Sequence, residues 1–324
     1  MINHVRGGVD MPRQLTILDR LPKVRGRYSL EINLSRLTWF QVGGPAQVLF
    51  KPADVEDLAF FLRQKPDDIP VFVFGVGSNL LVRDGGVPGV TIRLGKGFTN
   101  VAVSETTINV GAGMLDRLVS MVACEEALKG LEHLCGIPGT IGGALRMNAG
   151  CYGSEMKDIL EAAFAVDGRG KFHTLTNGEM GFKYRGCSVP EDWIFVGALL
   201  KGQSGNSAII RDRIQVLLAE REKTQPVNTR TGGSTFANPV GYKRKAWELI
   251  HQAGCRGLRQ GKARVSELHC NFLVNTGGAT AEDLETLGEE VRRRVLQTSG
   301  IDLIWEVKRV GIFKDSDKLE EKAA

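Results

Sequence analysis

The segment from Leu134 to Gly153, LCGIPGTIGGALRMNAGCYG, constrains the fold more than any other part of this chain. It holds six glycines and one proline, yet it is apolar between them, and Arg146 is its only charged residue. A flexible linker would be polar and rich in Ser or Lys. Glycine inside packed structure indicates a positive φ or a backbone that approaches another group closely. The segment therefore predicts a packed loop whose backbone contacts a ligand.

The composition is that of a globular protein, with 42% hydrophobic and 24% charged residues in 324. This length corresponds to two or three domains, or to one large domain. The net charge of +5 is spread along the chain. It is compatible with an anionic small-molecule ligand, but it lacks the clustered basic stripe of a nucleic-acid binder. We therefore expect no nucleic-acid partner.

Cysteine and histidine spacing argues against a metal centre. The six cysteines form no C-x-x-C pair, and the five histidines show no H-E-x-x-H spacing. No apolar segment follows a basic start, and the longest apolar runs are too short to span a bilayer. We expect a cytoplasmic protein with reduced thiols, no metal and no membrane partner.

Hydrophobic periodicity predicts a mixed α and β chain with many short strands. The strands are expected at 46–50, 71–75, 80–83, 90–94, 107–110, 160–167, 193–202, 271–275 and 304–311. Helices are expected after Asp54, which suits an N-cap, after Gly111–Gly113, and at 208–223, 245–254 and 280–299.

Three of these helices carry detailed expectations. In the helix after Gly113, which Gly130 is expected to end, the predicted inward stripe is Leu115, Leu118, Val119 and Val122. In the helix at 208–223 the inward residues are Ile210, Ile214, Leu217 and Leu218. Thr280 caps the helix at 280–299, whose inward residues are Leu284, Leu287, Val291 and Val295.

Two further glycine loops permit more than one interpretation. GVGSN, Gly75 to Asn79, follows a strand, but the next segment is another strand and a third glycine is missing, which excludes a Rossmann fingerprint. It can present N–H groups to a phosphate, or it is a plain tight turn, which five residues alone favour. GAG, Gly111 to Gly113, opens a helix and is either an anion site or a packing turn.

The first segment gives the strongest of the three signals. Its run of Pro138, Gly139, Thr140, Gly142 and Gly143 predicts exposed backbone amides that lead into a short helix. Three amide-rich segments with almost no cationic side chains suggest a large ligand held mainly by backbone. A flavin dinucleotide suits that description.

Seven motifs then carry a family resemblance. They are RLTWFQVGGPA, GVGSNLLVRDGGVPGVTI, GIPGTIGGALRMNAGCYG, YRGCS, GSTFANP, AWELIHQAGCRGLRQGKARVSELHCNFLVN and WEVKRVG. In this order, over roughly residues 30 to 313, the sequence resembles bacterial UDP-N-acetylenolpyruvoylglucosamine reductases. It resembles the shorter subtype, because no tyrosine-bearing insertion separates YRGCS from WIFVGALL.

The resemblance implies an α+β protein. The expected architecture is the FAD-binding, vanillyl-alcohol-oxidase-like (PCMH-type) fold of two subdomains plus a C-terminal α+β substrate domain. The FAD-binding domain would cover 31–220, split near 100, and the substrate domain 221–313. We expect residues 1–30 to be a flexible N-terminal segment and 314–324 a disordered tail.

The resemblance also implies the ligands and the residues that hold them. The cofactor would be non-covalent FAD, with NADPH as hydride donor and a UDP-sugar as substrate, in cytoplasmic peptidoglycan precursor synthesis. The residues expected at FAD are Gly75, Gly77, Ser78, Asn79, Leu80, Gly113, Pro138, Gly139, Thr140, Gly142, Gly143, Asn148 and Gly150. Those expected at the substrate are Tyr184, Lys223 and Asn238.

By the same resemblance the reaction reduces an enolpyruvyl ether to a lactyl ether, with three catalytic residues. Arg185 would bind the substrate carboxylate, Ser234 would donate a proton, and Glu306 would assist. Without the resemblance, these residues would be interpreted as a surface arginine, a turn serine and a solvated edge glutamate. Lys223 would likewise be a solvated helix end.

Two alternative functions remain open at this point. A flavin-dependent sugar oxidase or dehydrogenase of the same fold would suit the motifs, and such enzymes often attach FAD covalently, for which His133 and Cys151 are available. A non-enzymatic nucleotide- or anion-binding protein is the second alternative. The sequence does not give the subunit number, and we expect a monomer.

Overall fold

The computed structural model describes residues 16–314. The predicted tail lies outside these residues except for Lys314, and so does the first half of the predicted flexible segment 1–30. The second half of that segment is ordered, contrary to expectation, with helix α1 at Ile17–Arg20 and strand β1 at Arg27–Asn33. The reason is tertiary: β1 pairs antiparallel with β2 along its length, so its backbone groups belong to a sheet.

The first sheet has the order β1-β2-β5-β3. β2 spans Pro45–Lys51, β3 Val71–Phe74 and β5 Val87–Arg93, with β5 parallel to both neighbours. Helix α2 (Val55–Gln64) covers one face, and Asp54 caps it by accepting from the Asp57 amide, as predicted. The 3₁₀ turns η1 and η2 lie at Leu34–Arg36 and Lys96–Phe98.

The second sheet is antiparallel and has the order β12-β11-β13-β7-β6. Its strands are β6 (Val101–Ser104), β7 (Thr107–Gly111), β11 (Leu160–Val166), β12 (Phe172–Thr176) and β13 (Ile194–Lys201). Helices α3 (Asp116–Glu125) and α4 (Ile141–Met147) contribute to the core beside this sheet. Short elements complete the lobe: β8 (Leu128–Lys129), η3 (Glu132–Gly136), β9 (Gly150–Cys151), β10 (Ser154–Glu155), η4 (Met156–Asp158) and β14 (Gln203–Ser204).

The stripe predicted for α3 is partly wrong. Leu115 and Leu118 are 38% and 41% exposed, and the buried side chains are those of Asp116, Val119, Ser120, Ala123 and Cys124. The cause is a backbone contact at the start of the helix, where Asp116 N donates to Gly139 O at 3.2 Å. This contact fixes the rotation of α3 and turns its small side chains inward. Gly130 does not end the helix, which stops at Glu125.

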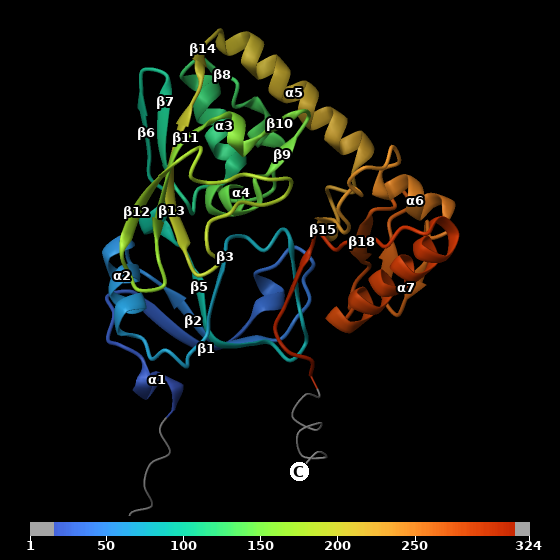
Figure 1. Ribbon diagram of the computed structural model, residues 1–324, viewed down its shortest axis with the longest axis horizontal. Helices are drawn as coiled ribbons and strands as arrows, with labels where there is room; N and C mark the ends of the chain where they lie inside the picture. The colour runs from blue at the N-terminus through green and yellow to red at the C-terminus, as the bar shows by residue number, and fades with distance from the viewer. Residues whose placement is uncertain (1–15, 315–324) are drawn as a thin grey trace, which may run out of the picture.

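The third region contains a small sheet of order β15-β18-β17-β16 beside two helices. Its elements are β15 (Arg230–Ser234), α6 (Ala246–Gln252), β16 (Arg259–Gln260), β17 (Ala263–Val265), β18 (Phe272–Asn275) and α7 (Ala281–Ser299). The predicted Thr280 cap of α7 and its inward residues are confirmed. Helix α5 (Ser207–Thr224) leads from the second lobe towards this region, and its predicted inward residues are confirmed (Figure 1).

The C-terminal segment returns to the first lobe. Strand β19 (Lys308–Val310) pairs in parallel with β4 (Leu80–Val82), so the red end of the chain in Figure 1 lies against an early segment. Phe40, Val42 and Leu81 in turn belong to the buried cluster of the third region. The packing core therefore joins residues from both sides of the domain boundary that we placed at 220. Within 16–314, no helix is long and apolar enough to cross a bilayer.

Candidate active site

The structure brings the three glycine segments together. A Cβ on Gly75 would collide with Oγ1 of Thr140, so the GVGSN loop lies directly against the PGT loop. A Cβ on Gly139 would lie 2.8 Å from Oδ2 of Asp116. Gly142 N donates to Ala112 O at 2.9 Å, which joins the third segment to the other two.

Two of these segments leave backbone donors free, and we call them together the amide cradle: Val76–Asn79 and Gly139–Gly143. Within the described chain, the amides of Val76, Gly77, Ser78, Asn79, Gly139, Thr140 and Gly143 donate to no other group. Backbone N–H groups that are buried are almost always paired, and neighbouring free amides form anion sites. The amide cradle therefore fits a diphosphate held without metal.

The GAG segment, by contrast, offers no free donor. Gly111 donates to Asn100 O, Ala112 to Val196 O and Gly113 to Phe98 O, at 2.8 to 3.0 Å. Of the two interpretations of GAG, the packing turn is the one supported. Gly113 is therefore adjacent to the predicted cofactor site, but its amide is not free to bind a cofactor.

Two asparagines predicted at FAD are held by protein groups. Asn148 is 1% exposed and ends α4 as its C-cap, with a positive φ. Its side-chain NH₂ donates to the Glu155 carboxylate and to Lys183 O, and its Oδ1 accepts from Lys157 N. Its side chain is therefore held by protein groups, and its predicted place at FAD stays a prediction. Asn79 donates to Glu306 O at 3.1 Å and accepts from Lys308 N at 3.0 Å. It joins the amide cradle to the C-terminal strand that carries Glu306.

Arg185 and Glu306 form an ion pair across the lobes, with Nε to Oε1 at 2.9 Å. Arg185 stands at the tip of a tight turn closed by Lys183 and Gly186, with a φ of 56°. Its guanidinium also reaches Gly150 O at 3.4 Å and lies 5.1 Å from the ring centre of Tyr184. The arginine is thus fixed with the Nε edge of its guanidinium against the glutamate.

Glu306 and Ser234 occupy neighbouring backbone positions. Glu306 N donates to Thr235 O at 2.8 Å, which sets the glutamate beside the end of β15. Gly233, on the other side of Ser234, would place a Cβ 4.0 Å from Ser78 O in the amide cradle. Ser234 therefore lies between the amide cradle and the glutamate. Burial raises the pKa of Glu306, and the Arg185 charge offsets part of this rise.

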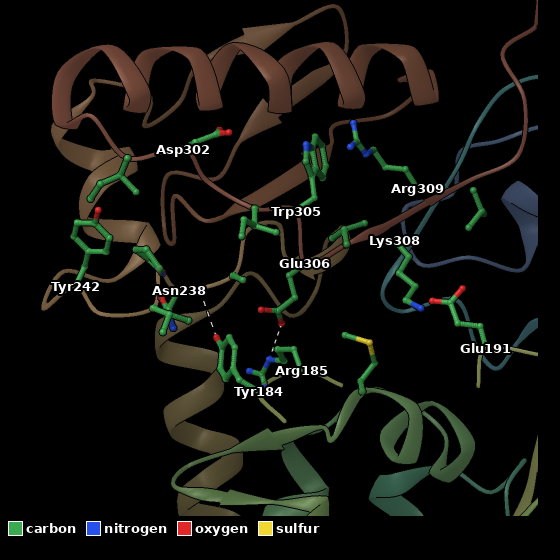
Figure 2. Close-up of a pocket in the computed structure, with 18 of the residues that line it drawn as sticks. Tyr184, Arg185, Glu191, Asn238, Tyr242, Asp302, Trp305, Glu306, Lys308 and Arg309 are labelled. Carbon is green, nitrogen blue, oxygen red and sulfur yellow. Dashed lines mark hydrogen bonds and ion pairs between the residues drawn. The ribbon is translucent and has the colours of Figure 1, made fainter. Parts of the chain in front are cut away.

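A cavity of about 1030 Å³ opens beside this ion pair. Figure 2 shows Arg185 and Tyr184 on one side of it and Glu306, Trp305 and Tyr242 on the other. Of the residues predicted from sequence, Tyr184, Arg185, Asn238 and Glu306 line it. Ser234 and the glycine loops adjoin it without lining it. Lys223 is exposed in the last turn of α5, away from the lining, and its predicted role stays a prediction.

Sequence reasoning missed two residues near the amide cradle. Arg93 ends β5, and its guanidinium lies 5.6 Å from the ring centre of Phe74, the residue before Gly75. It has no ion-pair partner in residues 16–314, and burial lowers its pKa. The sequence signal that could have identified it is an arginine at the end of an otherwise largely apolar strand.

Asp116 is the second missed residue. It is fully buried, neither carboxylate oxygen has a hydrogen-bond partner, and burial raises its pKa well above the ordinary value. No sequence signal marks it, because acidic residues are common in the first turn of a helix. Among residues 16–314 no group of three His, Cys, Asp or Glu side chains is arranged to hold a metal.

Comparison with known families gives two matches. Residues 225–310 match the C-terminal domain of UDP-N-acetylenolpyruvoylglucosamine reductase, and residues 46–176 match an FAD binding domain. The second match contains both segments of the amide cradle. The first contains Ser234 and Glu306.

Whole-length relatives agree with these matches. The UDP-N-acetylenolpyruvoylglucosamine reductases of Rhodospirillum rubrum and Parvibaculum lavamentivorans are 59% and 58% identical, each over 92% of this chain and 95% and 96% of their own. The crystal structure of the reductase from Thermus caldophilus superposes with a TM-score of 0.76 at 36% identity. The match covers 89% of this chain and 100% of that one.

Proposed function

The chain belongs to the UDP-N-acetylenolpyruvoylglucosamine reductase family, and from this premise we propose which of its residues perform the reaction. It is an FAD-containing oxidoreductase of peptidoglycan precursor synthesis, with the FAD-binding fold that the sequence resemblance implied. NADPH is the reductant we propose. The observation that carries the residue assignments is the Arg185–Glu306 pair beside the amide cradle, formed by residues 121 apart in sequence.

The free amides of the amide cradle support its assignment to the FAD diphosphate. Seven unpaired N–H groups meet there, and Arg93 at the end of β5 adds a nearby positive charge that has no carboxylate partner within residues 16–314. When bound, FAD supplies the hydride that reduces the substrate's vinyl carbon. The residues of the amide cradle bind and orient the cofactor, while those around Glu306 act on the substrate.

The surroundings of His133 and Cys151, the two residues that a covalent link to FAD would use, favour non-covalent attachment. His133 is 4% exposed, and the Cys151 thiol donates to His133 O at 3.1 Å. Burial raises the pKa of Cys151 to about 12, so the thiolate needed for attack is scarce at neutral pH. This favours the reductase over a sugar oxidase with covalent flavin.

Arg185 is assigned to the substrate carboxylate. Negative charge develops beside that carboxylate when the vinyl carbon accepts hydride, and a preorganised cation stabilises it. Arginine keeps its charge at all working pH values and can bind a carboxylate through two parallel hydrogen bonds. Its pairing with Glu306 through Nε leaves the terminal nitrogens directed elsewhere, one of them at Gly150 O.

Ser234 is assigned to the proton that the adjacent carbon must then receive. Its position between the amide cradle and Glu306 supports this role, because the reacting carbon must lie between cofactor and acid. A serine hydroxyl is a weak acid, so it needs a neighbour that can return the proton. Glu306 is suited to that, because it lies beside the segment that carries Ser234 and burial raises its pKa above that of an ordinary glutamate.

The visible spectrum of the purified protein tests the assignment of both half-reactions. A flavin band should bleach with NADPH under anaerobic conditions and return when UDP-N-acetylglucosamine enolpyruvate is added. A band that bleaches but does not return would contradict the substrate assignment. Flavin that stays with the acid-precipitated protein would contradict non-covalent binding.

We also propose the setting in which the enzyme works. Its partners would be a UDP-sugar and NADPH, and it would act as a monomer in the cytoplasm. All six cysteines are free thiols in the described residues, as expected in a reducing compartment. Light scattering on the purified holoenzyme measures the mass directly, and a dimer mass would contradict the monomer assignment.

A further inference from the structure

The chain leaves the regular sheet at Ser234. Strand β15 ends at this residue, and the register of its pairing with β18 shifts between Thr231 and Ser234. Such a shift marks a β-bulge, where the regular ladder of hydrogen bonds is interrupted. Thr235 and Phe236 follow directly and are buried, so their backbone groups need partners inside the protein.

Asn271, which lies immediately before β18, supplies partners for this segment. Its side-chain Oδ1 accepts from Phe236 N at 3.0 Å, and its Nδ2 donates to Phe236 O at 2.8 Å. Its backbone O accepts from Thr235 N at 2.7 Å. A side-chain amide offers both a donor and an acceptor, as a peptide group does. The Asn271 side chain therefore takes the place of a neighbouring strand beside Phe236.

The other edge of the same segment holds Glu306. Thr235 O accepts from Glu306 N at 2.8 Å, and Phe236 forms an antiparallel bridge with Trp305, the residue before the glutamate. Thr235 and Phe236 therefore lie between Asn271 on one side and the backbone of Glu306 on the other. Because Ser234 directly precedes them, a shift of this segment would displace the serine and the backbone contact of the glutamate together.

A second buried asparagine near Asn271 makes a different set of bonds. Asn275 ends β18 and is 4% exposed, against 5% for Asn271. Its Nδ2 donates to Phe40 O at 2.9 Å, and its Oδ1 accepts from Gly277 N and Ala279 N at 2.9 and 3.1 Å. None of these partners belongs to the segment that Asn271 holds. The two asparagines are therefore equally buried and both fully bonded, but their side chains hold different parts of the chain.

We propose that Asn271 is a positioning residue for the reduction, which keeps Ser234 and Glu306 in register with each other. It acts through the backbone of Phe236 and does not line the cavity. The inference rests on the proposed function, in which Ser234 delivers the proton and Glu306 assists. A misplacement of about 1 Å can cost about a hundredfold in rate. Reduction of the flavin by NADPH needs neither residue, so the loss of Asn271 should slow only the transfer to the substrate.

The test follows the two half-reactions of the holoenzyme by stopped-flow absorbance. Asn271→Ala leaves Phe236 N and O without partners, so reoxidation of the reduced flavin by UDP-N-acetylglucosamine enolpyruvate should slow by about 10- to 100-fold. Reduction by NADPH should keep the wild-type rate. The matched control is Asn275→Ala, which removes the bonds of an equally buried amide and should leave both rates unchanged. Chemical denaturation of both variants measures the loss of stability that they share.

A milder variant and a second measurement serve where Asn271→Ala folds poorly. Asn271→Ser leaves room for a water molecule that can satisfy Phe236 without fixing its position, so reoxidation should again be slowed. The solvent deuterium isotope effect on reoxidation should rise above the wild-type value in both variants, because proton delivery becomes the slow step. Partial unfolding lowers the amplitude of the flavin signal, whereas the isotope effect reports on the flavin-loaded fraction alone.

Three results would overturn the proposal: wild-type reoxidation in both Asn271 variants, equal slowing in Asn275→Ala, or equal slowing of reduction and reoxidation in Asn271→Ala. The last would show that the residue is structural only. Ser234→Ala, measured in the same way, separates this inference from the proposed function. Slow reoxidation in Ser234→Ala with normal Asn271 variants would remove the positioning role alone. Normal reoxidation in Ser234→Ala would instead contradict the proposed proton donor, on which the role of Asn271 depends.

Discussion

The amide cradle and the cluster of Arg185, Ser234 and Glu306 lie side by side but are built in opposite ways. The amide cradle uses short stretches of backbone whose N–H groups are free, and its side chains contribute little charge. The cluster uses side chains, two of them charged and paired at 2.9 Å, from turns and strand ends far apart in the sequence.

This difference predicts how each region tolerates change. Backbone recognition is indifferent to most side chains but is blocked by a Cβ where a loop packs closely, against Thr140 at Gly75 and against Asp116 at Gly139. Side-chain chemistry depends on the identity of one group and on its exact neighbours. The cofactor should therefore be lost through changes of shape, and catalysis through conservative changes of chemistry.

The largest effect is expected for Ser234→Ala. Reduction of the flavin by NADPH should stay close to wild type, while transfer to the enolpyruvyl substrate should fall by about a thousandfold, the usual range for loss of a general acid. Stopped-flow absorbance of each half-reaction separates the two. Equal slowing of the two half-reactions would mean that the serine affects the bound cofactor. The separation of roles between the amide cradle and the cluster would then be wrong.

Arg185→Lys should lower substrate turnover by roughly a hundredfold, because the planar fork is lost although the charge remains. The measurement is kcat/KM for the enolpyruvyl substrate, with FAD content checked from the spectrum. Arg169→Lys, an exposed arginine in the turn before β12, is the matched control. Near-wild-type turnover would return Arg185 to an ordinary surface role.

The amide cradle has its own charge test in Arg93→Met. Removal of this unpaired cation should weaken FAD binding by about tenfold, without the complete loss that a blocked loop would cause. Fluorescence titration of FAD into the apoprotein gives the dissociation constant. An unchanged dissociation constant would mean that backbone amides alone hold the diphosphate. The amide cradle would then use no side-chain charge at all, in contrast to the cluster.

The smallest effect is expected at Asp116. Its pKa is raised in the native state, so the native protein retains a proton that the unfolded chain loses above the ordinary Asp pKa. The free energy of unfolding should therefore fall as pH rises from about 4 towards the native pKa. Asp116→Asn should remove this decline, so that its stability relative to wild type rises between pH 4 and pH 8 and the difference vanishes near pH 4.

Chemical denaturation at several pH values measures this effect, with a neutral-to-neutral change nearby, Ser120→Ala, as the control. Parallel pH profiles for Asp116→Asn and wild type would show that the carboxyl is not protonated in the native state. Asp116 would then be a buried negative charge beside Gly139 of the amide cradle.

Local patterns predicted much of the fold. The Asp54 and Thr280 caps and the inward faces of α5 and α7 follow from hydrogen-bonding side chains and a 3.6-residue period. The rotation of α3 did not follow, because a backbone bond from Asp116 to Gly139 turns Leu115 and Leu118 outward. Strand β1 was missed as well, because its stability comes from pairing with β2.

The sequence alone determined where the backbone carries no side chain and can pack closely, since the positions of glycines are a local property of the chain. It also placed the GVGSN and PGT loops beside the ends of predicted elements, and both became parts of the amide cradle. Only the tertiary structure decided which amides remain free, which arginines are neutralised and which cations are not. Free donors and uncompensated charges are properties of neighbours in space, and spacing along a chain does not determine those neighbours.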